Sequence, residues 1–272
     1  MDMPPRLTDR DALRRNRARA DRSALFLHDL ARDEAEDRLG MVNRKFTAPA
    51  VVTPFPELWR ESTPDACIVE DTEVLALEPG AHDLVIHALC LHWADDPVGQ
   101  LIQLRHALKP DGMALVLTLG GQTLHELRAA LGQAETEVTG GLSPRVLPMG
   151  DIRDLGALMQ RAGLALPVAD AAPLRATYAT PLHLMKELRA MGEGNALAGR
   201  LRHATRRAVL LRAAQIYAES FATEDGRVAA TFEMITLTGW APDASQPQPL
   251  RPGSATHRLA QVLGTDETSL KD

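Results

Sequence analysis

Few side chains in this 272-residue sequence have the types and spacing that catalysis or ligand binding requires, and two of them follow a long apolar run. His92 and Trp93 come at the end of Leu84–Leu91, a run typical of a strand buried on both faces of a parallel sheet. Ligands bind outside the carboxyl ends of such strands, so this pair could position a substrate. The alternative is a hydrogen-bonded histidine beside an indole that packs in the core. His87, inside the run, fits a core histidine better.

Other polar groups carry weaker signals. Glu135 and Glu137 are too close in sequence to share a helix face, which argues against a carboxylate pair for acid–base catalysis. Gly120-Gly121 precedes a helix and could bind an anion there, or could form a tight strand-to-helix turn. The sequence has no HxxxH or CxxC spacing, and its two cysteines make no disulfide framework. We therefore expect no metal site and a location in the bacterial cytoplasm.

A sheet is needed to position these residues, and the middle of the chain predicts one. Strand-like and helix-like segments alternate from about residue 48 to residue 165, which is typical of a doubly wound α/β sheet. The alternating pattern of Arg227–Trp240 predicts a long edge strand, and Thr123–Glu126 predicts a capping box at a helix start. Thr8 is the expected N-cap of a first helix that continues to about Leu39.

Charge and domain organisation limit the function classes. The net charge of −6 argues against nucleic-acid binding, and no apolar run reaches the length of a membrane span. Residues 5–22 hold seven Arg and three Asp, which fits either a basic helix over an acidic partner or a solvated or intramolecular face. We expect an N-terminal helical segment (1–45), an α/β domain (46–245) with a helical lid at about 180–222, and a flexible tail (246–272).

Three stretches of the sequence resemble a known family. The first, His82–Gly112, resembles the fourth and fifth strands of class I S-adenosylmethionine methyltransferases, including the malonyl-carrier-protein methyltransferase of biotin synthesis. The other two stretches are Gly120–Arg128 with Ala134–Glu137 and Gly140–Arg145, and Leu188–Asn195 with Gly239-Trp240 and Arg251–Ala255. Over roughly residues 82–256 the chain resembles the methyltransferase-like assembly factor of mitochondrial respiratory complex I and its bacterial relatives.

The resemblance implies a fold, a cofactor and site residues. The fold would be a Rossmann-like doubly wound α/β sheet with a helical lid, and the cofactor S-adenosylmethionine. The expected cofactor-binding residues are Thr53, Asp71, Thr72, Leu89 and Leu91. The expected substrate-binding residues are His92, Trp93, Gly121, Tyr178, Glu193 and Asn195. Because the mitochondrial relative is regarded as a protein-arginine hydroxylase, the fold does not guarantee methyl transfer.

The cofactor-binding half of the fold is truncated in this sequence. The family places a Gly-rich turn after the first strand, but Thr53-Pro54-Phe55-Pro56 stands here and no glycine occurs between Gly40 and Gly80. The ten residues between Phe55 and Ala66 leave room for one short helix, whereas a helix, a strand and a second helix need on the order of 30 residues. We therefore expect weak or absent cofactor binding, the alternative being a rebuilt loop that binds through other contacts.

Two functions follow from these observations. The first is an S-adenosylmethionine-dependent methyltransferase-family protein of the complex I assembly-factor type with a degenerate cofactor loop. The second is a catalytically inactive relative that binds a partner. In either case we expect a protein substrate or a respiratory-complex subunit as the partner.

Overall fold

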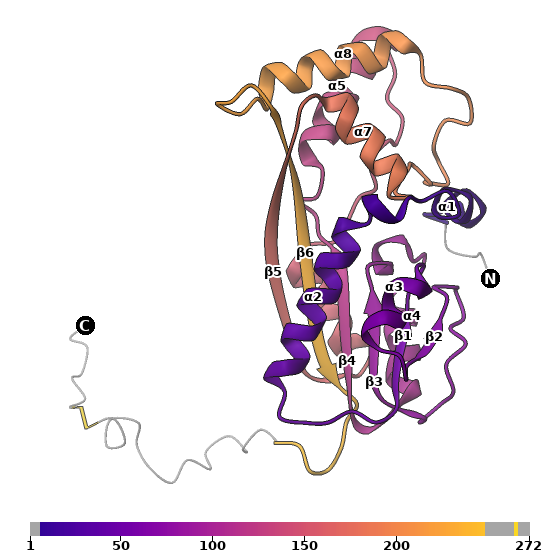
Figure 1. The fold of residues 1–272 in the computed structure, drawn as a ribbon, viewed down its shortest axis with the longest axis vertical. Coiled ribbons are helices and arrows are strands. Elements are labelled where there is room, and N and C mark those ends of the chain that lie inside the picture. The colour runs from indigo at the N-terminus through magenta and orange to yellow at the C-terminus, as the bar shows by residue number, and fades with distance from the viewer. Residues whose placement is uncertain (1–5, 248–263, 266–272) are drawn as a thin grey trace, which may run out of the picture. The chain divides into compact units, whose positions relative to one another are not determined.

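The computed structural model describes residues 6–247 and 264–265, and Met1–Pro242 forms one compact unit built around a six-stranded sheet. The strands are β1 (Pro49–Val52), β2 (Cys67–Val69), β3 (His82–Ala88), β4 (Leu108–Leu119), β5 (Ala165–Tyr178) and β6 (Val228–Trp240). Their spatial order is β2-β1-β3-β4-β6-β5 (Figure 1). The first four strands are parallel, and β6 lies antiparallel between β4 and β5.

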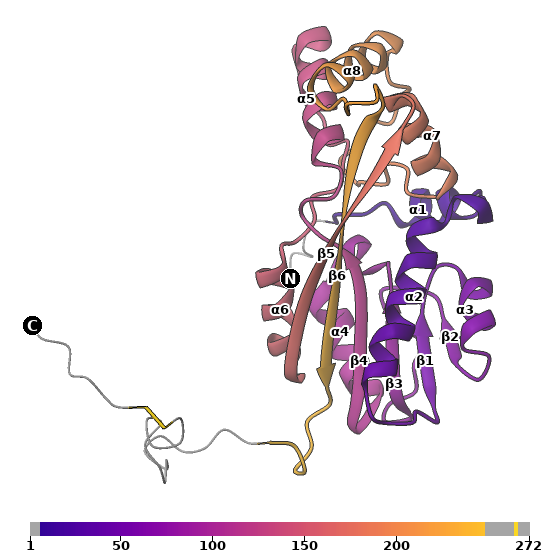
Figure 2. The same ribbon diagram turned by 60° about the vertical axis from the view of Figure 1, so that its left-hand side comes forward.

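The helices pack on both faces of this sheet and beyond its upper end. They are α1 (Arg10–Arg17), α2 (Phe26–Met41), α3 (Pro56–Ser62), α4 (Pro97–Ala107), α5 (His125–Thr139), α6 (Ile152–Arg161), α7 (Pro181–Ala190) and α8 (Arg207–Ser220), with short 3-10 helices at Arg22–Ala24 and Leu91–Trp93. The apolar faces of α2 and α3 share one core cluster, and those of α4 and α6 share another. The two pairs of helices lie on opposite faces of the sheet (Figure 2). This alternation gives the expected three-layer α/β architecture.

The shortened first crossover is confirmed. Between β1 and β2 the structure has only α3, and β2 pairs directly with β1 in parallel register, Val52 opposite Val69. Pro56 occupies the first position of α3, where its missing amide hydrogen costs nothing. The sheet therefore has a truncated N-terminal half, as the length of this segment predicts.

Three sequence expectations are wrong in detail. The first helix is broken after Arg17, and its N-cap is Asp9, whose side chain accepts from the Ala12 amide, because the Thr8 hydroxyl bonds elsewhere. The long strand β6 is internal, since β5 covers its outer edge. The capping box at Thr123 does not form: α5 begins after Leu124 in a left-handed conformation, and the Thr123 hydroxyl bonds β6 instead.

Two other expectations concern the ends of the chain and the membrane. Most of the expected flexible tail, including the family-like stretch Arg251–Ala255, lies outside the described residues. Within the part that is described, no helix combines the length and apolar character needed to cross a bilayer.

Candidate functional site

A large pocket opens between the carboxyl ends of the parallel strands and helix α7. It encloses about 870 Å³ and is bounded by residues that follow β3 and β4, by the 145–149 segment and by α7 with the turn after it. Its walls are mostly apolar, and the apolar side chains include Leu27, Leu119, Leu124, Leu127, Val146, Leu147, Met149, Met185, Leu188, Ala190, Met191 and Phe232. The volume is in the range of small-ligand sites, and the position, beyond the carboxyl ends of parallel strands, is where ligands bind in such folds.

A buried carboxylate belongs to this pocket. The Trp93 indole Nε1 donates a 2.7 Å hydrogen bond to Glu193 Oε2, while Glu193 Oε1 is buried and has no hydrogen-bond partner among the described residues. His92 Nε2 lies 3.7 Å from the same Oε2. Burial by itself would raise the pKa of Glu193, but His92, Arg17 and Trp93 hold it at about 2. Glu193 is therefore an ionised, incompletely satisfied acceptor.

Two glycines let the N-terminal segment approach this carboxylate. Gly192 has φ +85°, and a Cβ placed on it would stand 3.0 Å from the Arg17 Cα. Gly194 accepts a 3.0 Å hydrogen bond from Asn16 Nδ2 through its carbonyl. Because larger residues would push α1 away, the glycines on either side of Glu193 let α1 pack against the turn that follows α7.

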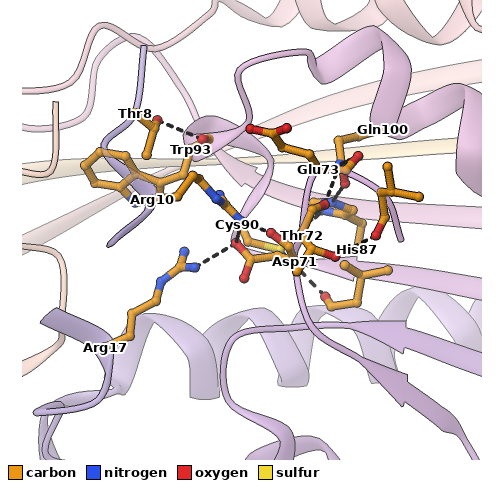
Figure 3. A network of polar contacts seen from close by, with 12 residues as sticks. Thr8, Arg10, Arg17, Asp71, Thr72, Glu73, His87, Cys90, Trp93 and Gln100 are labelled. Carbon is orange, nitrogen blue, oxygen red and sulfur yellow. Dashed lines mark hydrogen bonds and ion pairs between the residues drawn. The ribbon is translucent and has the colours of Figure 1, made fainter. Parts of the chain in front are cut away.

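A second polar cluster is formed by Asp71, which follows β2, together with Arg10 and Arg17. Arg17 Nη1 pairs with Asp71 Oδ2 at 2.7 Å, and Arg10 donates to the Asp71 carbonyl oxygen (Figure 3). The side chains of Arg17 and Asp71 are only 8% and 12% exposed. Arg17 also has two buried nitrogens, Nε and Nη2, without a partner in the described part of the chain. The chain's own N-terminal segment therefore occupies the carboxylate that the family resemblance assigns to a cofactor.

A smaller cavity of about 250 Å³ lies beside Asp71, Thr72 and Cys90. His87 Nε2 lies 3.3 Å from Gln100 Oε1 on α4, and burial lowers the pKa of His87 to about 4. Burial also raises the pKa of the Cys90 thiol well above its usual range, so this cysteine is protonated and is a poor nucleophile. The buried position and hydrogen bond of His87 fit its expected role as a core histidine.

The structure brings only some of the predicted site residues together. His92, Trp93 and Glu193 are in contact, and Asn195 lines the same pocket but uses its side chain to bind Pro144 O and Leu197 N. Asp71 and Thr72 border the smaller cavity.

The remaining predicted residues lie elsewhere. The side chains of Leu89 and Leu91 pack in the core, and Thr53 is fully buried after β1. Gly121 lies in the turn after β4, where a Cβ would stand 3.3 Å from Met149 O, and the neighbouring Gly120 donates to Glu233 O at 2.8 Å, which favours the tight-turn interpretation. Tyr178 lies at the end of β5 in a separate surface hollow beside Glu187 and Arg227.

Sequence reasoning missed two buried members of this region. Arg17 stood in an arginine-rich run that gave no reason to single it out. His28 lies on the buried face of α2, its Nδ1 has no partner among the described residues, and burial lowers its pKa to about 4. The useful signal was the position of His28 among Leu27, Ala31 and Ala35, which are all buried.

Comparison with known proteins identifies the family. Residues 42–116 match the family model described as "Methyltransferase domain". Arginine-hydroxylase NDUFAF5, mitochondrial, of Danio rerio is 38% identical over 199 residues, covering 73% of this chain and 62% of the relative. The Homo sapiens protein of that name is 38% identical over 199 residues, covering 73% and 57%. The chain thus spans about three fifths of these relatives' length.

A second group of relatives and one solved structure agree with this assignment. Malonyl-[acyl-carrier protein] O-methyltransferase of Halorhodospira halophila is 34% identical over 174 residues, covering 64% of this chain and 57% of that protein. A crystal structure of a putative methyltransferase from Bacillus halodurans superimposes with a TM-score of 0.50 at 13% identity, covering 77% of this chain and 98% of that one. The latter likeness concerns the fold alone.

The comparisons also correct one expectation. A bacterial cytoplasmic location is wrong on these findings, because the NDUFAF5 relatives from Danio rerio, Mus musculus, Homo sapiens and Dictyostelium discoideum are mitochondrial proteins of eukaryotes. Fold, matched domain and relatives lead to the same result: the chain is a methyltransferase-family protein with the class I methyltransferase fold, related to the NDUFAF5 arginine-hydroxylases and to the malonyl-[acyl-carrier protein] O-methyltransferases.

Proposed function

We propose that this chain binds an arginine side chain of a partner protein in the 870 Å³ pocket, with Glu193 as the acceptor for the guanidinium group. The observation that carries the proposal is the buried Glu193 Oε1 without a partner among the described residues, on a carboxyl whose pKa is held at about 2. A guanidinium offers several N–H donors and a permanent positive charge, and its methylene stem suits apolar walls. Such charge-assisted hydrogen bonds are the strong ones.

The relatives support this substrate class. The NDUFAF5 proteins are named arginine-hydroxylases, and the chain matches them over 73% of its own length. By this relationship the partner would be a subunit of respiratory complex I and the location mitochondrial. The role would be that of an assembly factor that recognises, and in its relatives modifies, an arginine.

S-adenosylmethionine, which the family implies, does not fit these residues in the family's usual position. The amide of Phe55, which lies between two prolines in the turn after β1, donates to the Thr53 hydroxyl at 3.1 Å. The Asp71 carboxylate is already paired with Arg17, and Arg10 lies 3.5 Å from it. Each lost cofactor hydrogen bond would cost roughly 0.5–3 kcal/mol. The proposal therefore assigns no step to this cofactor.

Methyl transfer is the second candidate function, and one feature favours it. The 250 Å³ cavity beside Asp71 and Thr72 leaves space where the family places the adenine. Isothermal titration calorimetry with S-adenosylmethionine separates the two candidates: no saturable heat at millimolar ligand supports the degenerate site, and a micromolar dissociation constant restores the methyltransferase.

Peptide binding tests the proposed role of Glu193. A fluorescently labelled peptide with a central arginine should bind the wild-type chain more tightly than the same peptide with citrulline, which is neutral and nearly the same shape. Glu193→Gln keeps an acceptor for the Trp93 N–H but removes the charge, so the arginine peptide should lose about 2 kcal/mol or more, roughly thirtyfold in Kd. Glu224→Gln, at an exposed position, is the matched control and should change nothing. Equal affinity for arginine and citrulline peptides would refute the proposal.

A further inference from the structure

The entrance of the 870 Å³ pocket has the opposite charge from Glu193. Four cationic side chains line the pocket, and Glu193 is the only carboxylate among its described lining residues. The four cations are Arg19, Arg145, Lys186 and Arg189. Three of them (Arg19, Lys186 and Arg189) are exposed, in a chain whose formal net charge is −6. This basic mouth, defined by the four residues, is therefore a local departure from the charge of the whole molecule.

The cations of the basic mouth differ in how far the protein neutralises them. Arg145 forms an ion pair with Glu135 at 2.6 Å, and burial of that pair leaves it little freedom to bind elsewhere. Arg19 donates to Asn16 Oδ1, a neutral acceptor. Lys186 and Arg189 are three residues apart on helix α7. Their side chains form no ion pair or hydrogen bond with any residue that the structure describes. Three of the four positive charges thus have no internal carboxylate partner in the described structure.

This arrangement conflicts with a substrate that is basic throughout. Glu193 attracts the guanidinium group of the bound arginine. The approach of that group past the exposed cations of the basic mouth is unfavourable unless other groups of the partner neutralise those cations. Lys186 and Arg189 lie on the same side of α7, because residues three apart on a helix are neighbours. Carboxylates on either side of the inserted arginine would pair with Lys186 and Arg189, and the guanidinium group could then reach Glu193.

We infer that the basic mouth is a docking surface for an acidic stretch of the partner protein, the stretch that flanks the arginine bound by Glu193. The inference rests on the proposed function and adds what that function leaves open, namely which arginines are accepted. An arginine within a basic segment would be rejected at the mouth, and an arginine between Asp and Glu residues would be selected. Specificity would thus come from repulsion of wrong segments as well as from attraction of the right one.

Fluorescence anisotropy with three blocked heptapeptides tests this inference. Each has a central arginine between glycines, and the outer positions carry Asp and Glu, Asn and Gln, or Lys. The acidic peptide should bind roughly tenfold more tightly than the neutral one at low salt, and the lysine peptide should bind more weakly than both. The advantage of the acidic peptide should shrink as ionic strength rises, because exposed charges are screened.

A double variant locates the effect. Lys186→Gln with Arg189→Gln should remove most of the difference in affinity between the acidic and the neutral peptide. Arg153→Gln with Arg161→Gln removes two exposed cations of α6 and should keep the advantage in full, which controls for net charge. Equal affinity of acidic and neutral peptides, or an equal loss in both double variants, would overturn the inference. If an acidic peptide with central citrulline binds as well as its arginine form, the proposed function fails instead.

Discussion

Arg17 and Asp71 form an ion pair that is unusual for its burial. Asp71 and Glu193 raise the pKa of Arg17 against the opposing effect of its burial, and one nitrogen, Nη1, makes the 2.7 Å contact. Breaking a buried pair leaves an uncompensated charge, whereas replacing both partners does not. The cost of removing both residues should therefore be smaller than the sum of the costs of removing each one alone.

A double-mutant cycle checks this. Asp71→Asn alone should destabilise the chain by about 3 kcal/mol, and Arg17→Met with Asp71→Asn should cost less than the sum of the single changes. Urea unfolding measures both. The exposed pair Arg14–Asp11, whose side chains are 75% and 73% exposed, is the control and should show no measurable coupling. Additive losses at Arg17 and Asp71 would mean that the pair contributes packing alone.

At the scale of elements, the N-terminal segment connects the end of the sheet to the segment between α7 and α8. Leu7 and Thr8 donate their amides to Asp95 Oδ1 at 2.9 Å, and the Thr8 hydroxyl donates to Trp93 O. On the other side, Asp9 pairs with Arg200 and Arg202, which together with the Ala12 amide lower the pKa of Asp9. The arginine-rich start of the chain therefore has an intramolecular role in part, one of the two readings that its charge pattern left open.

Glycine substitution tests how tightly this segment is held. Gly192→Ala combines a left-handed φ with a Cβ 3.0 Å from the Arg17 Cα, so it should destabilise the chain and reduce the hydrogen-exchange protection of α1. Gly226→Ala has a similar φ of +75° but nothing within 4 Å of the new Cβ, so it should carry only the backbone cost of roughly 1–2 kcal/mol. Equal effects on α1 in the two variants would show that the segment does not depend on close approach at Gly192.

The elements were more predictable than the contacts between them. Apolar runs, proline positions and the length of the Phe55–Ala66 segment predicted β3, α4, α3 and the truncated sheet correctly, since these depend on local pattern and chain length. The prediction that Thr123 caps a helix was wrong because its hydroxyl forms hydrogen bonds with the backbone of Glu233 on β6, more than 100 residues away in sequence. Arg17 could not be picked from its run because only the fold decides which arginine reaches Asp71. Long-range polar partners are not encoded in local spacing.

At the scale of the whole molecule, buried histidines should make stability fall in mild acid. Burial lowers the pKa of His28 and of His87 to about 4, below the usual 6.5. The unfolded chain therefore binds more protons than the folded chain between these values, and stability is full above about pH 6.5 and is lost as pH falls towards 4. Each histidine should remove about 2 kcal/mol between pH 7 and pH 5. Glu135 and Glu193, whose pKa values are held at about 2, add further loss only below about pH 4.5.

Urea unfolding at pH 7 and pH 5 measures this loss. His28→Phe has no proton to gain and already has an aromatic neighbour, since the His28 ring stacks edge-on with Phe55 at 4.7 Å. It should recover about half of the acid-induced loss. His203→Gln, at an exposed position, should keep the wild-type dependence on pH. An unchanged slope in His28→Phe would show that the pKa of His28 is the same in the folded and the unfolded chain.

The long-range contacts of the N-terminal segment have a consequence for how the chain folds during synthesis on the ribosome. Asp71 is synthesised 54 residues after its partner Arg17. Gly194 is synthesised 178 residues after its partner Asn16. At about 5–20 residues per second, the second contact becomes possible on the order of 10–40 s after the first residue of the pair has been added. Leu13, whose core cluster includes Ala196 and Leu197, cannot be fully covered before these residues have been made. The final docking of the N-terminal segment would be a late event, in which the first helix to be made packs against one of the later segments of the chain.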